Sequence, residues 1–284
     1  MAVHPDTAIG VVALTVTDLA RSRDFYERAV GLHATEAEDG TLALGAPGHP
    51  ALITLRGDAS APALDRHATG LFHLALLLPS RHDLALALRR LAEQRWPLDG
   101  ASDHLVSEAL YLSDPDGNGI EIYRDRARQE WRRANGELQM ATLPLDLDSI
   151  IAELHGPEDR ADAIAPETQM GHVHLQVADL PSAEAFYAGA LGFDVVVRTY
   201  PGALFVSAGG YHHHIGLNTW HSAGAAPPAP GAVGLRSFHV ALPGEAEFER
   251  TLEGLAAAGV EAERSNGDAV VRDPSGNVVV LTAR

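Results

Sequence analysis

The sequence predicts an α+β protein of two tandem domains, each made of paired βαβββ modules that form a curved mixed β-sheet around a cavity. The main support is an internal repeat: residues 9–32 align without a gap on residues 170–193, with ten identical positions among 24. Two shorter matches follow in the same order, FHLAL with FHVAL and DPDGNGIEI with DPSGNVVVL. With 284 residues, the chain is long enough for two domains with separate cores.

Each half is expected to begin with a strand, a helix and three further short strands. In the first half, the alternating segment VVALTVTD ends at Asp18, which suits a helix N-cap. Gly31 suits the position just after the helix, where a left-handed backbone is common.

A second module of the same kind follows in each half. In the first half it starts with LFHLALLLP and continues with a helix at about 82–94. It ends with two strands joined by the turn Asp-Pro-Asp-Gly-Asn at 114–118.

The repeats predict an N-terminal domain at 1–125 and a C-terminal domain at 168–284. Residues 126–167 do not repeat, are rich in charge, and contain one expected short helix, LDSIIAELHG. We interpret them as a connecting segment between the two domains.

The composition argues against several classes of function. A formal net charge of −17 repels phosphate backbones, so binding to nucleic acid or to an anionic membrane is not expected. The N-terminus has no basic stretch followed by an apolar one, so no signal peptide is expected. The chain has no Cys, which excludes thiolate chemistry and agrees with a cytoplasmic location. A homo-oligomer is compatible with the sequence.

Histidines gather on three expected strands of the second half. Because side chains alternate along a strand, His172, His174 and Gln176 share one face of GHVHLQV. His239 lies on the matching face of FHVAL, and the run YHHHIGLNTW supplies three more histidines.

Imidazole is a common ligand of transition metals, and two or three with open positions suit Fe(II) or Mn(II). A single His on a strand is ordinarily a satisfied polar residue, and three adjacent ones can be a surface run. The clustering on homologous strands nevertheless favours a metal site in the second half.

These motifs resemble the vicinal oxygen chelate superfamily, which includes glyoxalases, bleomycin-resistance proteins and extradiol dioxygenases. The segments that carry the resemblance are GHVHLQVADL, GGYHHHIGLNTW, FHVAL and DPSGN. Within the superfamily, the whole chain is similar to two-domain ring-cleavage enzymes of the catechol 2,3-dioxygenase type. The βαβββ pattern is specific for the superfamily but less so for ring cleavage.

The resemblance implies metal ligands at His172, His239 and, on the last strand, position 280. Position 280 is Val, which cannot bind a metal, so a histidine of the triple run is expected to replace it. Strand parity favours His214 or His212 for that ligand. The family's acid–base histidine aligns with His213. This alignment differs by one residue from the alternation of side chains along the strand, and a β-bulge would reconcile the alignment with the alternation.

The first half carries the complementary part of the pattern. His73 matches His239, and Glu121 occupies the carboxylate position, but Val11 stands where the first-strand histidine is expected. We interpret this half as a structural copy and keep His73 and Glu121 as the second-choice site.

The function implied by the resemblance is an Fe(II)- or Mn(II)-dependent extradiol dioxygenase of aromatic catabolism, with a catechol-like diol and O2 as substrates. His213 would move the proton of the diol. We expect His174, His212, Tyr211 and Trp220 to contact the substrate.

Two other functions stay open at this point. One is a glyoxalase-like metalloenzyme, which needs no O2. The other is a non-catalytic binding protein, in which Val280 and Val11 mark two broken metal sites.

Overall fold

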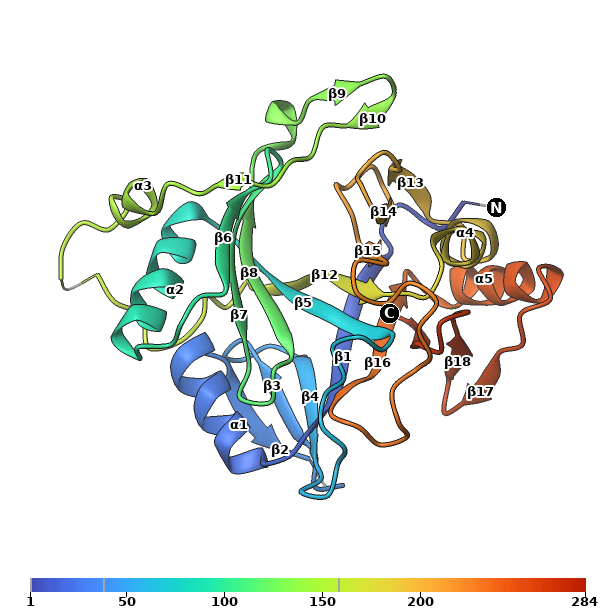
Figure 1. Cartoon of the computed structure of the whole chain (residues 1–284), viewed down its shortest axis with the longest axis horizontal. Coiled ribbons are helices and arrows are strands. Elements are labelled where there is room, and N and C mark those ends of the chain that lie inside the picture. Colours follow the sequence, from blue (N-terminus) through green and yellow to red (C-terminus); the bar gives the residue numbers. More distant parts are fainter. Residues whose placement is uncertain (1, 38, 158) are drawn as a thin grey trace.

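The computed structural model describes residues 2–37, 39–157 and 159–284, and its strands form two large mixed sheets (Figure 1). Sheet I has the strand order β17-β18-β19-β16-β1-β4-β3-β2, and sheet II has the order β11-β6-β7-β8-β5-β12-β15-β14-β13. Strands β9 and β10 form a separate small hairpin. The α+β fold class predicted from the repeats is confirmed.

Sheet I contains strands from both ends of the chain. Their bounds are β1 Ala8–Val16, β2 His33–Glu36, β3 Leu42–Gly45, β4 Ala51–Gly57, β16 Gly234–Leu242, β17 Glu263–Ser265, β18 Asp268–Arg272 and β19 Val278–Ala283.

Sheet II contains the strands from the middle of the chain. Their bounds are β5 Gly70–Leu78, β6 Gly100–Asp103, β7 Ser107–Ser113, β8 Gly119–Asp125, β11 Leu143–Pro144, β12 Gln169–Gln176, β13 Asp194–Val197, β14 Ala203–Ser207 and β15 Ile215–Asn218; the hairpin is β9 Arg133–Ala134 with β10 Glu137–Leu138.

The helices are short, and most follow the first strand of a module. They are α1 Leu19–Phe25 with the π-helical turn η1 Tyr26–Val30, α2 Arg81–Glu93, the 3₁₀ turn η2 Arg128–Glu130, α3 Leu147–Ile151, α4 Leu180–Glu184 with η3 Ala185–Ala190, and α5 Glu245–Ala257. The helix expected at about 82–94 is therefore confirmed within one residue at each end. No helix in the described ranges is both long enough and apolar enough to cross a membrane.

The four modules pair across the two halves of the chain. In sheet I, β1 of the first module runs antiparallel to β16 of the fourth. In sheet II, β5 of the second module runs antiparallel to β12 of the third, and Figure 1 shows these two strands side by side. Each half thus gives one module to each sheet, whereas the repeat had suggested that the modules of one half share a sheet. The boundaries 1–125, 126–167 and 168–284 stay a prediction.

Local sequence explains how the helices begin and end. The side chain of Asp18 accepts hydrogen bonds from the backbone N–H groups of Ala20 and Arg21, as the N-cap prediction requires. Gly31 follows η1 with φ at +86°, a left-handed conformation that a side chain disfavours.

Two equivalent turns tie the modules of each half together. In the turn after β7, the carboxylate of Asp114 accepts hydrogen bonds from the backbone and side chain of Asn118. It also accepts one from the hydroxyl of Tyr26, which belongs to the first module, at 3.2 Å. Tyr187 and Asp273 repeat this contact at 2.9 Å in the second half. The repeated segments therefore hold sheets I and II against each other.

Candidate metal centre

Three buried side chains from sheet II meet at one point. The Nε2 atoms of His73 and His172 lie 3.0 Å and 3.1 Å from the same oxygen, Oε2 of Glu121. One ligand atom from each of the three residues falls within 4.8 Å of the others, and all three residues are buried. They come from three adjacent strands, β5, β8 and β12.

Ala75 in the central strand explains why these side chains converge. Glu121 is its cross-strand partner on one side, and His172 is its partner on the other. Directly paired residues point to the same face of a sheet, and His73, two residues earlier on β5, shares that face. The single methyl group of Ala75 leaves a space between the three larger side chains.

The donor set fits a divalent transition-metal ion. Two imidazoles and one carboxylate are typical of non-haem Fe(II) oxygenases. Two ligands bound at right angles, each at about 2.1 Å, lie about 3 Å apart, which matches both histidine–carboxylate distances. Within the described residues, Nδ1 of His172 has no hydrogen-bond partner, so the contact with Glu121 is the one hydrogen bond of this ring.

The protonation states agree with metal binding. Burial lowers the pKa of His172 to about 4, so its ring is neutral and keeps a free lone pair at pH 7. Burial alone would raise the pKa of Glu121, but His172 and His73 outweigh it and hold that pKa well below its usual range. The centre thus presents a carboxylate and a neutral imidazole.

Comparison of the modules indicates that the described residues offer three candidate ligands and not four. His174 pairs with Gly216 in the third module as Ala75 pairs with Glu121 in the second, so Gly216 occupies the position equivalent to Glu121. A Cβ atom at Gly216 would lie 2.9 Å from the ring of His174. Gly216 therefore leaves that side of the centre open to a substrate and lets His174 occupy its place.

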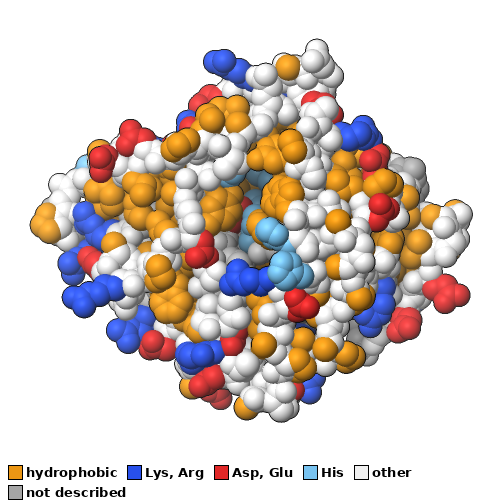
Figure 2. All heavy atoms as spheres, in the orientation of Figure 1, with side chains coloured by type: hydrophobic (Ala, Val, Ile, Leu, Met, Phe, Trp, Pro, Cys, Tyr) orange, Lys and Arg blue, Asp and Glu red, His pale blue; other side chains and the backbone are white. Residues whose placement is uncertain are grey.

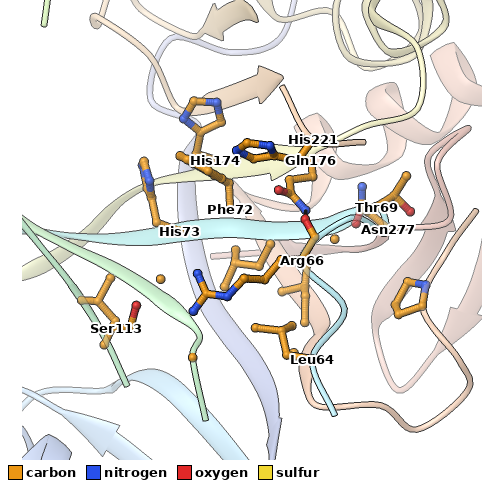
Figure 3. A pocket seen from close by; sticks show the side chains of 18 of the residues that line it. Leu64, Arg66, Thr69, Phe72, His73, Ser113, His174, Gln176, His221 and Asn277 are labelled. Atoms are coloured by element: carbon orange, nitrogen blue, oxygen red, sulfur yellow. Dashed lines mark hydrogen bonds between the residues drawn. The ribbon is translucent and has the colours of Figure 1, made fainter. Parts of the chain in front are cut away.

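A cavity of about 1640 Å³ opens from this centre to the surface, where Figure 2 shows a hollow edged by histidine and basic side chains. The rings of Phe72, Phe205 and Trp220 line it. Figure 3 shows His73 and His174 projecting from β5 and β12 on the same side, while Arg66 reaches in from the loop before β5.

Besides His73 and Glu121, three more of the predicted site residues line this cavity: His213, His174 and Trp220. The ring centroid of His213 lies 4.1 Å from that of His172. His212 and Tyr211, which were expected to contact substrate, are buried behind His213 and form hydrogen bonds to Asp125 instead.

The structure does not place His214 or His239 near His172 as ligands of one metal. The strand β15 begins only at Ile215, so side-chain alternation does not extend to the triple histidine run. Nδ1 of His214 accepts the backbone N–H of Ala208 and stays out of the cavity.

His239 lies in sheet I, because its module pairs with the first module and not with the third. There it is the partner of Val280, and Gly10 of β1 lies against it. His239, Val280 and Val11 are the repeat equivalents of His73, Glu121 and His172. Sheet I thus has one of the three candidate ligands, whereas sheet II has all three. The second-choice residues His73 and Glu121 join first-choice His172.

Three residues near the centre were missed from the sequence: Ala75, Tyr111 and Asp125. Tyr111 lines the cavity beside Glu121, and burial together with that carboxylate raises the pKa of its hydroxyl well above the usual value. Strand alternation could have indicated Asp125, because it shares a face of β8 with Glu121 and Tyr123.

Residues 8–122 and 169–281 match the model of the Glyoxalase/Bleomycin resistance protein/Dioxygenase superfamily, so the chain belongs to this superfamily. It is 44% identical over 276 residues to a catechol-2,3-dioxygenase of Bacillus subtilis (strain 168), covering 96% of this chain and 95% of the relative. This relationship classes the chain with the dioxygenase enzymes of the superfamily.

Solved structures agree with the fold. A proposed dioxygenase from Bacillus subtilis subsp. subtilis str. 168 has a TM-score of 0.67 at 16% identity, covering 100% of this chain and 86% of that one. Glyoxalase I from Zea mays has a TM-score of 0.59 at 15% identity, covering 98% of this chain and 92% of that one. At such identities, the likeness concerns the fold alone.

Proposed function

We propose that the chain is an extradiol dioxygenase that opens a catechol-like aromatic diol with O2, using Fe(II) or Mn(II) held by His73, Glu121 and His172. The observation that carries the proposal is this set of two histidines and one carboxylate with its fourth side left open at Gly216. An open side is what a diol with two adjacent oxygens needs, because both oxygens must reach the ion together with O2. A role in aromatic catabolism in the cytoplasm belongs to the same proposal.

When bound, the ion supplies Lewis acidity toward the diol oxygens and the electron transfer that O2 activation requires. The protein's own residues orient the ring and move its proton. Phe72, Phe205 and Trp220 give the diol apolar walls. His213 lines the cavity near His172 and takes the proton of the diol. Burial lowers the pKa of its ring well below the usual value, so the ring is neutral and has a lone pair for that proton.

The size of the cavity bears on the range of substrates. At about 1640 Å³ it exceeds the roughly 300–1,000 Å³ of most ligand pockets, so the proposal includes diols with ring substituents.

The test is O2 uptake by protein loaded anaerobically with Fe(II), and in parallel with Mn(II), then mixed with catechol. We expect one O2 consumed per diol lost, with both oxygen atoms in the ring-opened product. Turnover of a carbonyl substrate without O2 would instead indicate a glyoxalase-like enzyme. Protein that takes up neither ion would contradict the proposal and leave a binding protein.

A further inference from the structure

Behind His213, a chain of hydrogen bonds leads from the cavity to the edge of the molecule. Nδ1 of His213 lies 2.8 Å from Nδ1 of His212, and Nε2 of His212 lies 2.8 Å from Oδ1 of Asp125. The side chain of His212 is fully buried, whereas that of Asp125 is 25% exposed. The three groups therefore connect the cavity wall to solvent.

The positions of the protons in this chain follow from the contacts. A carboxylate only accepts hydrogen bonds, so His212 must carry its proton on Nε2, facing Asp125. In the neutral form of this ring, Nδ1 then has only a lone pair. Because the two Nδ1 atoms face each other at hydrogen-bond distance, the proton between them belongs to His213.

The neighbouring tyrosines favour the same arrangement. The hydroxyl of Tyr211 donates to Oδ1 of Asp125 at 3.3 Å and lies 2.7 Å from the hydroxyl of Tyr123. Asp125 is therefore the acceptor for two donors. The ring of Trp131, from the connecting segment, packs edge-on against that of His212, with 5.4 Å between the ring centroids.

We infer that Asp125 and His212 are positioning residues that fix the tautomer of His213, with the proton on Nδ1 and a free lone pair on Nε2 toward the cavity. This inference rests on the proposed function for its purpose, because a free Nε2 lone pair is what a general base needs. In the opposite tautomer, His213 would present an N–H group to the diol and could not accept its proton.

The test reads the tautomers directly. Long-range ¹H–¹⁵N NMR of histidine-labelled, metal-free, full-length protein separates protonated from unprotonated ring nitrogens, and His212→Phe and His213→Phe assign the signals. We expect the wild type to carry its protons on Nε2 of His212 and Nδ1 of His213. A wild type with Nε2–H on His213 would overturn the inference.

The variant Asp125→Leu removes the acceptor. His212 is then expected to move its proton to Nδ1, because a buried N–H without a partner is less tolerated than a bare lone pair, and the proton of His213 should shift to Nε2. The matched control is Asp103→Leu, since Asp103 is also 25% exposed but pairs with Arg126. Unchanged signals in Asp125→Leu, or equal shifts in both variants, would contradict the inference.

Activity gives the second measurement. In metal-loaded protein, Asp125→Leu should lower kcat roughly tenfold or more with little change in KM, and Asp125→Glu, which keeps a carboxylate, should recover much of it. Expected tautomers in a protein without O2-dependent turnover would refute the proposed function and leave the positioning intact. Ring cleavage together with the opposite tautomer would overturn the positioning inference and leave the proposed function intact.

Discussion

At the scale of single residues, Ala75 matters because it leaves the space that an ion between the three candidate ligands would need. It is fully buried and has Glu121 and His172 as partners on its two sides. Its repeat equivalent in sheet I is Ala241, which pairs with Thr282 on one side and Ala8 on the other, and these residues do not form a ligand set. Ala241 is only half-buried, so its substitution serves as a control for metal binding and not for the cost of overpacking.

We expect Ala75→Leu to lower metal affinity roughly tenfold or more, because the larger side chain fills the space between the three ligands. Overpacking should also cost about 1–3 kcal/mol of stability. Elemental analysis after Fe(II) loading measures the first effect and urea unfolding the second. Ala241→Leu should keep its metal, and loss of metal in that variant alone would contradict the assignment.

The sequence predicted correctly which way some of these side chains face and failed for others. Alternation placed His174 and Gln176 on the cavity side and Val173 in the core. The same rule failed for His214, because alternation applies only within a strand and β15 begins one residue later. Sequence alone did not show where the strand begins.

At the scale of elements, a group of charged residues connects α2 to strand β7 of sheet II. Glu108 of β7 accepts from Nε of Arg81 at 2.9 Å and from Nε of Arg124 at 2.7 Å, and Arg126 contacts its other oxygen at 3.2 Å. Arg81 also donates to Glu153 just after α3. The side chain of Glu108 is only 5% exposed, so these contacts are shielded from solvent.

This group predicts a specific loss of stability in acid. Burial would raise the pKa of Glu108, but the hydrogen bonds from Arg81 and Arg124 outweigh it and lower that pKa. Since the folded-state pKa lies below the unfolded value of about 4.3, the stabilisation is complete above about pH 4.3 and disappears as the pH falls through the folded-state pKa.

Glu108→Gln should therefore be less stable by about 2–3 kcal/mol at pH 7, and the difference from wild type should shrink as the pH falls below about 4. Urea unfolding at a series of pH values measures this. A constant difference between the two proteins across that range would show that Glu108 has no shifted pKa.

At the scale of the whole molecule, the two halves interlock. The repeat revealed four modules, but it could not reveal which modules share a sheet. Equivalent first strands have similar sequences, so β12 could pair with either β5 or β16 by pattern alone. The choice depends on packing between segments far apart in the chain, and it decides which histidines lie close enough to share a metal.

Interlocking predicts how the separated halves behave. A fragment of residues 168–284 contains His172 but lacks His73 and Glu121. It should therefore not bind Fe(II) stoichiometrically, that is, at one ion per chain. It should also self-associate, because the pairing edges of β12 and β16 are uncovered. Mixing it with residues 1–167 should restore metal binding, as measured by size-exclusion chromatography with elemental analysis. A monomeric fragment that binds metal alone would mean that the halves are independent domains.

The most direct test of the shared centre compares the repeat equivalents His73 and His239. His172→Ala alone would not discriminate, because His172 belongs to both candidate ligand sets. We predict about one Fe or Mn per chain in the wild type and in His239→Ala, and almost none in His73→Ala, by elemental analysis after anaerobic loading. Metal retained in His73→Ala and lost in His239→Ala would place the centre in the C-terminal half and contradict a metal centre shared between the two halves.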